Sequence, residues 1–337
     1  MDELACGVAT CKMRCHAARG PGETFKGSKY FGKEQSRLLQ TMRIISTSGR
    51  EKSVKRYKSL LAGLGIDEVS YHVFTSASNE GSNIITPDEF AAAIKSKESP
   101  CIGAAISKDI KGKIIPFLDK LDETADEVQS VNTIVRDPDG LLTGYNTDAY
   151  GFRQAINGAI IEAAKKYELT CNNAVVYGYG GVTSVVVHVL RSLGIKNIYL
   201  TGRNLDKARE RAIGLGCLSW EPDSPCDLFV NASPVTDKPL EAADNFLPSL
   251  TPSSGGPCVV FDHEMPGQYL KDWALAQEQL VYVSGYDMYY PQMKRQWELF
   301  LGNHASREDI GTVLDALIRE EQEQEQEQEQ EQEQEQE

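Results

Sequence analysis

The chain of 337 residues has no excess of positively charged residues. It also has no apolar run of about 20 residues, the length that a membrane-spanning helix needs. Its formal net charge is −14, but ten glutamates lie in residues 320–337, and without those ten the charge is −4. A body so close to neutral gives no electrostatic basis for binding nucleic acid. The sequence therefore predicts a soluble, cytoplasmic protein with no membrane or nucleic-acid partner.

Cysteine is sparse, with eight residues spread over the chain, and only Cys6, Cys11 and Cys15 lie close together. The segment "CKMRCH" lacks a second Cys/His pair at zinc-finger spacing, so no metal site is predicted. The other cysteines lie mostly in apolar segments, as is typical of reduced thiols in the cytosol.

Both ends of the chain lack the apolar periodicity of a packed core. Residues 1–40 are rich in Gly, Ser and Lys and contain no signal-peptide core, which predicts a flexible extension and leaves an organellar presequence open. Residues 320–337 alternate Glu and Gln almost without interruption, and their like charges repel along a helix. This segment is predicted to be disordered.

Between these ends, strand-like and helix-like segments alternate from about Thr41. The alternation predicts the α/β class, with two parallel, helix-flanked sheets. We expect domains at 41–150 and 151–285, followed by helices at 286–319 that pack back on the first domain. Within the first domain, "KIIPFLDKLDETADEV" predicts a helix.

A glycine turn, "VVYGYGGVTS", lies between an apolar strand and a helix, with Gly178, Gly180 and Gly181 at the turn. Glycine lets the backbone approach a pyrophosphate and leaves helix N–H groups free to bind it. The following strand ends in "TGRN", where Arg203 replaces the acid typical of NAD binders and favours a 2′-phosphate. The segment predicts a Rossmann-type domain that binds NADP, with Asp206 keeping NAD open.

The segment "SVNTIVRDPDGLLTGYNTDAYGF" predicts a hairpin around an Asp-Gly turn. It places two Asn-Thr pairs at the hairpin's open end, the second followed by Asp148. Such side chains often brace turns by bonding backbone groups, which is the structural interpretation. Two pairs beside an acid, in a chain with a cofactor turn, favour a substrate site.

These segments, with "VNASP" and "GYDMYYPQMKRQWELFLG", resemble the shikimate/quinate dehydrogenase family over roughly residues 41–302. The resemblance implies a substrate-binding α/β domain joined to the Rossmann domain, with the active site in the cleft. It also implies oxidation of a ring alcohol on a polyhydroxylated carbocycle by NADP or NAD, in the chorismate pathway of aromatic amino acid biosynthesis. The expected partner is a small polyol carbocycle, bound by a monomer or homodimer.

The resemblance also assigns the site. It implies a catalytic pair of Lys111 and Asp148, which agrees with the need for a base beside the oxidised hydroxyl; Lys108 and Lys113 are competing lysines. The implied substrate-binding residues are Ser53, Ser107, Asn132, Thr147 and Gln292. The implied cofactor-binding residues are Gly178, Gly180, Gly181, Arg203, Asn204, Ser233 and Gly285.

The chain departs from the family pattern where the substrate carboxylate should bind. The family's Ser-x-Ser-Pro segment falls on Glu51, Ser53 and Val54, unless a gap shifts it to Ser46 and Ser48, and a family tyrosine falls on Met265. A glutamate repels a carboxylate, and methionine cannot donate a hydrogen bond. We therefore hypothesise an altered carboxylate end and a substrate other than shikimate itself.

Two other classes of protein remain as alternatives. A shikimate dehydrogenase-like sensor would bind the ring without turning it over, but it does not need the pair of Lys111 and Asp148. A glutamyl-tRNA reductase or methylene-tetrahydrofolate dehydrogenase shares the domain plan but does not explain "TGYNTD" together with "GYDMYYPQ".

Overall fold

The protein was analysed as a computed structural model, in which residues 40–337 form one compact unit. The predictions for residues 1–40, the cluster of Cys6, Cys11 and Cys15, and Lys108 lie outside the described residues. None of the described helices combines the length and apolar content needed to cross a bilayer. The structure describes residues 42–74, 85–97, 100–107, 110–167, 171–221, 224–233, 258–265, 268–276, 280–302 and 304–336.

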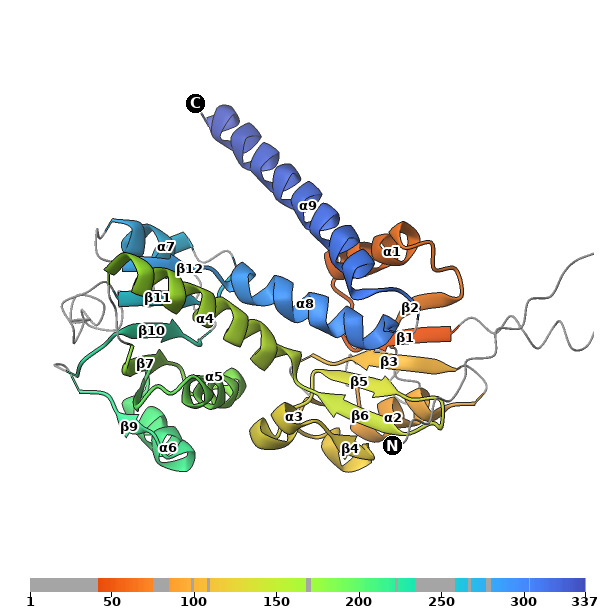
Figure 1. Cartoon of the computed structure of the whole chain (residues 1–337), viewed down its shortest axis with the longest axis horizontal. Helices are drawn as coiled ribbons and strands as arrows, with labels where there is room; N and C mark the ends of the chain where they lie inside the picture. Colours follow the sequence, from red (N-terminus) through yellow and green to blue (C-terminus); the bar gives the residue numbers. More distant parts are fainter. Residues whose placement is uncertain are drawn as a thin grey trace, which may run out of the picture. The chain divides into compact units, whose positions relative to one another are not determined.

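The first sheet has the strand order β2-β1-β3-β5-β6-β4 (Figure 1). β1 pairs in parallel with β2 and β3, whereas β5 runs antiparallel to β3 and β6. The predicted hairpin is confirmed, because a tight turn at 137–140 rather than a helix joins β5 to β6. The strands are β1 (Met42–Ser46), β2 (Val69–Val73), β3 (Cys101–Ala105), β4 (Lys120–Leu121), β5 (Thr133–Arg136) and β6 (Leu142–Tyr145).

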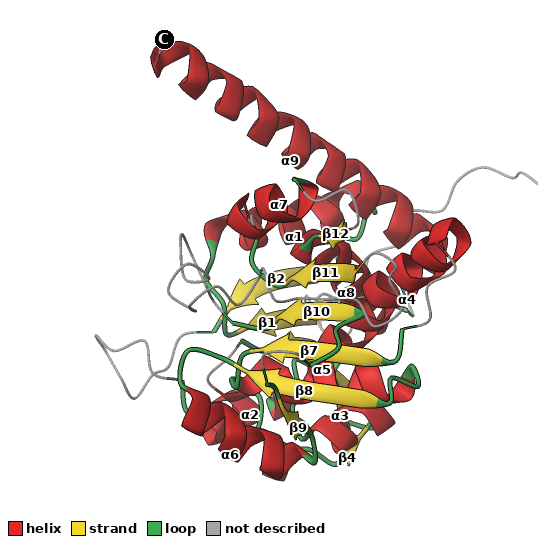
Figure 2. Ribbon diagram, turned by 90° about the vertical axis from the view of Figure 1, so that its left-hand side faces the viewer, coloured by secondary structure: helices red, strands yellow, loops and turns green. Residues whose placement is uncertain are grey.

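The second sheet is parallel throughout, with the order β12-β11-β10-β7-β8-β9 (Figure 2). This is the Rossmann order 3-2-1-4-5-6 read from its sixth strand, and the order reverses between β7 and β10. Ligands of such sheets bind at that reversal, beyond the carboxyl ends of the strands. The strands are β7 (Asn173–Tyr177), β8 (Asn197–Thr201), β9 (Leu218–Ser219), β10 (Leu228–Asn231), β11 (Cys258–Asp262) and β12 (Leu280–Val283).

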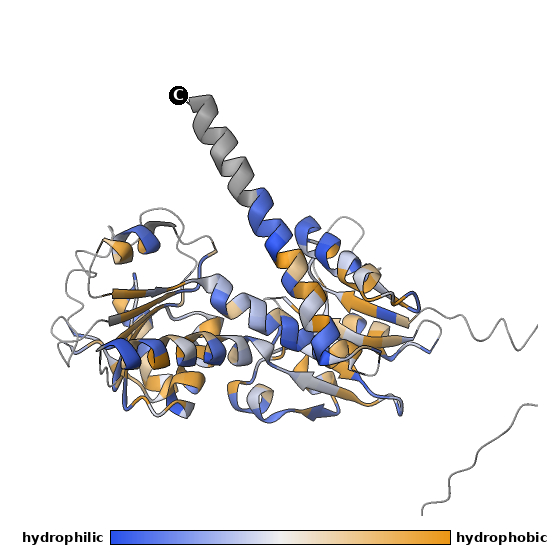
Figure 3. Cartoon of the chain, turned by 45° about the horizontal axis from the view of Figure 1, so that its top comes forward, coloured by the Kyte–Doolittle hydropathy of each residue, from blue (hydrophilic) through white to orange (hydrophobic). Residues whose placement is uncertain are grey.

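Helices cover both sheets and place the apolar side chains between the layers; the strands of the second sheet are mostly coloured as apolar in Figure 3. Trp297 and Leu314, from the last two helices, join one buried cluster with Ile44 and Leu60 of the first sheet and its helix. The expected α/β fold with a Rossmann-type sheet and returning C-terminal helices is confirmed. The helices are α1 (Glu51–Gly63), α2 (Pro87–Lys95), α3 (Glu123–Val128), α4 (Thr147–Tyr167), α5 (Gly181–Ser192), α6 (Leu205–Leu215), α7 (Gln268–Leu275), α8 (Gly285–Leu301), α9 (Arg307–Gln336) and the 3-10 helix η3 (Ile115–Phe117).

The helix predicted from "KIIPFLDKLDETADEV" is wrong. The segment forms η3, then β4, then the short α3. Pro116 lacks the N–H that a continuous helix requires there. Asp122 accepts a hydrogen bond from the Ala125 N–H at 2.9 Å, which caps a new helix instead.

The predicted disorder of residues 320–337 also differs from the structure, since α9 continues to Gln336. The helix is already formed by Ile310, Leu314 and Ile318, which pack in the core, so adding further turns carries no nucleation cost. Glu and Gln are good helix formers, and Glu321 pairs with the buried Arg56. Packing and one ion pair outweigh the repulsion read from the sequence.

Gly151 allows α4 and α8 to approach closely. A Cβ atom at Gly151 would lie 2.3 Å from the Met288 carbonyl oxygen and 2.7 Å from the Gln292 Cβ. Both distances are much shorter than a van der Waals contact. This contact between the helices sets the position of the α8 side chains over the start of α4.

We predict that Gly151→Ala lowers the free energy of unfolding by about 1–3 kcal/mol, because it overpacks this crossing. In Gly158→Ala, on the same helix, the new Cβ meets no atom within 4 Å, so this control should gain about 0.5–1 kcal/mol in helix propensity. Denaturant unfolding of both variants measures the two effects. Equal stability of the two would contradict the close approach.

Candidate active site

A cavity of about 540 Å³ lies at the carboxyl ends of strands from both sheets. Seven residues from the sequence prediction line it: Ser53, Ser107, Lys111, Asn132, Asp148, Gly285 and Gln292. Thr147 does not, being 2 % exposed. The structure thus brings together residues that are up to 239 positions apart in the sequence (Ser53 and Gln292).

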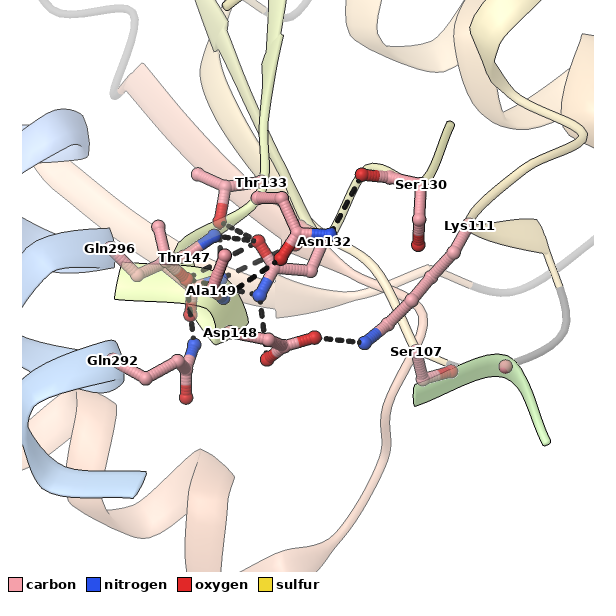
Figure 4. A network of polar contacts seen from close by, with 12 residues as sticks. Ser107, Lys111, Ser130, Asn132, Thr133, Thr147, Asp148, Ala149, Gln292 and Gln296 are labelled. Carbon is pink, nitrogen blue, oxygen red and sulfur yellow. Dashed lines mark hydrogen bonds and ion pairs between the residues drawn. The ribbon is translucent and has the colours of Figure 1, made fainter. Parts of the chain in front are cut away.

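Lys111 and Asp148 form an ion pair in this cavity, with 2.6 Å between the Lys111 Nζ and the Asp148 Oδ2 (Figure 4). Their side chains are 26 % and 20 % exposed, so both can be reached from the cavity. Burial raises the pKa of Asp148, but Lys111, His263 and Asn132 outweigh it, and the net pKa lies below the ordinary value. Of the two competing lysines, Lys113 is exposed and is not a lining residue.

Asn132 uses its whole hydrogen-bonding capacity inside the protein. Its Nδ2 donates to the Thr147 Oγ1 at 3.0 Å and to the Asp148 Oδ1 at 2.9 Å. Its Oδ1 accepts from the Thr133 hydroxyl at 2.8 Å and from the Thr147 N–H at 2.9 Å. Since an amide has two donor hydrogens and two acceptor sites, this arrangement orients Asp148 and leaves nothing for a substrate hydroxyl.

Thr147 lies behind the cavity, where its hydroxyl accepts a hydrogen bond from the Gln292 Nε2 at 2.9 Å. The described cavity lining does not include Thr147, because its side chain is buried between α8 and Asn132, and its contact with substrate stays a prediction. Among the described residues, the Gln292 side chain has one hydrogen bond, from its Nε2 to Thr147, and none to its Oε1. Gln292 can offer this acceptor to a ring hydroxyl.

The glycine turn follows β7, as the sequence predicts. Gly178 has φ +138°, and a Cβ there would lie 2.7 Å from the Ala232 carbonyl oxygen, so only glycine fits. A Cβ at Gly180 or Gly181 would meet no atom within 4 Å. Gly180 also caps α5 without a side-chain hydrogen bond, which leaves first-turn N–H groups for an anion. These residues fit a dinucleotide pyrophosphate.

The remaining predicted cofactor residues follow three strands of the second sheet, β8, β10 and β12. Arg203 is exposed just beyond β8, and Asn204 caps α6 by accepting from the Lys207 N–H at 2.9 Å. The Ser233 N–H donates to the Asn231 Oδ1, which lies at the end of β10. A Cβ at Gly285 would lie 2.8 Å from the Met265 Cγ, so α8 begins tightly against the end of β11.

Asp206, the acid that kept NAD open, is 96 % exposed and lies 3.7 Å from Arg209 on the same helix. Arg203 immediately follows Gly202, so it is the charged residue nearest the end of β8 in the sequence. A guanidinium at this position suits a ribose 2′-phosphate, while a carboxylate one turn away, paired with arginine, does not hold a 2′-hydroxyl.

Residues 46–53 form one part of the cavity, here called the serine wall. The residues that line it differ from those assigned from the sequence. Its lining residues are Ser46, Thr47, Ser48, Gly49, Arg50 and Ser53. Glu51 is exposed in the first turn of α1 and is not a lining residue, so the repulsive carboxylate inferred from sequence is absent from the described lining. Met265 does line the cavity, as expected.

Sequence reasoning missed three residues of the site. His263 lines the cavity and helps to lower the pKa of Asp148; its signal was its place directly after the strand "VVFD". Gln296 donates to the Thr133 hydroxyl at 2.8 Å and lies one helical turn after Gln292. Tyr289 lines the cavity from α8; it lies within the segment "GYDMYYPQ", but no role was assigned to it from the sequence.

No protein-family model matches the chain. A shikimate dehydrogenase (NADP(+)) of Halothermothrix orenii is 40 % identical over 153 residues, which cover 40 % of this chain and 49 % of that protein. A shikimate dehydrogenase-like protein of Haemophilus influenzae is 31 % identical over 136 residues, covering 40 % and 47 %. The chain thus spans about half the length of the curated relatives it matches.

Solved structures show the same fold over more of the chain. Quinate dehydrogenase from Corynebacterium glutamicum in complex with NAD gives a TM-score of 0.64 at 20 % identity, covering 82 % of this chain and 98 % of that one. Shikimate 5-dehydrogenase from Thermus thermophilus in complex with NADP(H) and shikimate gives 0.58 at 20 % identity, with the same coverage.

The depressed pKa of Asp148 predicts a specific acid sensitivity. Because the unfolded carboxyl binds a proton more readily, its contribution to stability is present above about pH 4 and is lost as the pH falls through the native pKa. Asp148→Asn should therefore lose less unfolding free energy between about pH 5 and about pH 3 than the wild type does. Denaturant unfolding at each pH measures this, with Asp67→Asn, an exposed site, as the control that should behave like the wild type.

Proposed function

We propose that the chain is a divergent member of the shikimate/quinate dehydrogenase family and an NADP-dependent oxidoreductase that interconverts a ring alcohol and a ring ketone on a shikimate- or quinate-like carbocycle. The observation that carries the proposal is the ion pair of Lys111 and Asp148 in the cavity at the carboxyl ends of strands from both sheets. Proton transfer to or from a ring oxygen needs such a pair within reach of the nicotinamide.

In the direction of ketone reduction, Lys111 donates a proton to the carbonyl oxygen as it becomes an alkoxide. Asp148 stays ionised and holds the ammonium group of Lys111 in position, and Asn132 holds Asp148. Gln292 accepts a hydrogen bond from a neighbouring ring hydroxyl and orients the ring. A bound nicotinamide supplies the hydride to the carbonyl carbon, and the reverse reaction returns it.

Cofactor binding is assigned to the ends of β7, β8 and β10. The Gly178–Gly181 turn and the first turn of α5 would hold the pyrophosphate, and Arg203 would hold the 2′-phosphate. Gly285 lines the cavity at the start of α8, and its missing side chain lets the helix begin close against the end of β11. This set favours NADP over NAD because the acid near β8 is turned toward Arg209.

We further propose that the end of the site that binds the carboxylate is altered rather than lost. Ser53 keeps one hydroxyl of the family pattern, while Met265 replaces a hydrogen-bond donor. Arg50 adds a cation to the serine wall, and Glu51 lies outside the lining. A ring carboxylate would therefore meet hydroxyl groups and a guanidinium, so shikimate itself is again a candidate substrate.

We predict that Lys111→Ala lowers kcat for NADP reduction by about 10²- to 10⁴-fold, because it removes the proton-transfer group. The KM for NADP should stay within about twofold, since Lys111 is not part of the proposed cofactor site. Absorbance of NADPH, read over shikimate, quinate and decarboxylated cyclitols, measures the rate. Lys113→Ala, exposed and outside the lining, is the matched control. Tight NADPH binding without turnover of any ring alcohol by the wild type would instead support a sensor.

For the cofactor, Arg203→Ser should raise the KM for NADP by about tenfold to a hundredfold, the loss of a charge-assisted phosphate contact. The KM for NAD should change little, because NAD has no 2′-phosphate. Arg209→Ser, in the following helix α6 and with the same change of charge, is the control. If both variants weaken NADP equally, general positive charge rather than Arg203 explains the preference.

A further inference from the structure

Arg56 of α1 is a buried cation, 5 % exposed, that connects the C-terminal helix to the cavity. Its Nε donates to the Glu321 Oε1 at 2.8 Å, and its Nη2 donates to the Glu321 Oε2. This bidentate pairing with a carboxylate on α9 fixes the plane of the guanidinium group. The remaining Nη1 donates to the Tyr289 hydroxyl oxygen at 2.7 Å.

Arg56 contacts both the hydroxyl group and the ring of Tyr289. Its hydroxyl oxygen accepts from the Arg56 Nη1, and the guanidinium carbon lies 5.4 Å from the centre of its ring. A hydroxyl that accepts from a cation is a stronger donor through its own O–H, and that hydrogen must point away from Arg56. Tyr289 lines the cavity, so a bound molecule lies within reach of this donor.

The surroundings of Tyr289 favour an anionic ligand group. Tyr57 and Tyr71 also line the cavity, and a hydrogen bond with Tyr289 helps to raise the pKa of Tyr57, as expected when the Tyr57 hydroxyl donates and the Tyr289 oxygen accepts. Burial raises the pKa of Tyr57 well above its ordinary value and that of Tyr71 to about 12, so both remain hydrogen-bond donors at neutral pH. Among the described lining residues the one carboxylate is Asp148, which Lys111 already pairs. The described lining of the cavity thus contains hydroxyl groups and the cation of Arg50, and its one carboxylate is already paired.

We infer that Tyr289 is a substrate-binding residue that donates its O–H to an anionic oxygen of the ligand, a ring carboxylate in the reaction proposed above. Glu321 on α9 is its positioning residue, acting through Arg56. This inference rests on the proposed function for the identity of the ligand, but the contacts that carry it do not involve the Lys111–Asp148 pair.

The test is calorimetric titration with shikimate and with its methyl ester, which has the same ring without the negative charge. Tyr289→Phe removes the donor and should weaken shikimate binding about tenfold, with a much smaller effect on the ester. Glu321→Gln keeps the size of the side chain but removes its charge, and should weaken shikimate binding about three- to fivefold. Glu323→Gln, two residues further along α9 and exposed, is the matched control and should bind as the wild type does.

The double variant separates positioning from simple stabilisation. If Glu321 acts through Tyr289, the variant with both changes binds shikimate no more weakly than Tyr289→Phe alone. The temperature of unfolding should fall for Glu321→Gln in either background, since the buried Arg56 loses its partner in both. If Glu321→Gln does not fold, Glu321→Asp, which keeps the charge but shortens the reach, and Tyr289→Phe carry the test.

Unchanged shikimate affinity in Tyr289→Phe, or multiplicative weakening in the double variant, overturns the inference. A wild type that oxidises shikimate while these variants bind normally leaves the proposed function intact. If the wild type and the variants show the expected affinities but the wild type never reduces NADP, the proposed function is contradicted and the inference is supported. A wild type that binds neither shikimate nor the ester contradicts both.

Discussion

The carboxamide of Asn132 has two hydrogens and one oxygen, and the protein uses all of them. It lies directly before β5, and the residues it binds lie directly after β6, so the pairing of these two strands determines whether the contacts form. Asp148 then takes one orientation, and that orientation sets where Lys111 points. If the amide had an unused hydrogen-bonding site, it could turn and let the carboxylate rotate, and the ion pair would lose its fixed place in the cavity.

This network also joins the hairpin to α8. Gln292 reaches Thr147 and Gln296 reaches Thr133 because Gly151 allows the two helices to come close. The same helix α8 begins at Gly285 against the end of β11, and its Tyr289 faces the cavity. One helix therefore carries Gln292 and Gln296, which bind the residues around Asn132, and Tyr289, which lines the cavity. Its placement couples these functions more tightly than separate loops could.

The sequence predicted the parts of this structure that depend on local periodicity and turn chemistry. The hairpin, the glycine turn after β7 and the βα alternation all follow from short segments, and so does the pairing of Lys111 with Asp148 once the family is considered. The helix over residues 113–128 failed because Pro116 and Asp122 act locally against a favourable composition. The burial of Thr147 could not be predicted because it depends on α8, which lies more than a hundred residues away.

Long-range contacts account for the other differences. Glu51 was placed in the site by counting along one segment, whereas its direction depends on how α1 begins after the Ser46–Arg50 connection. Tyr289 and Arg56 belong to helices with ordinary amphipathic patterns, and only their contact with Glu321 reveals a connected group. The Glu-Gln tail gave no signal for that contact, because each glutamate in it has similar neighbours.

The anchoring of α9 has a consequence for that repetitive segment. The core contacts end at Ile318, and the ion pair with Arg56 follows within one turn at Glu321. These contacts specify the register of the helix before most of the Glu-Gln repeat has begun. Gaining or losing Glu-Gln units farther along would therefore leave the anchor in place, so the length of the repeat is free to drift while its first acidic residues are not.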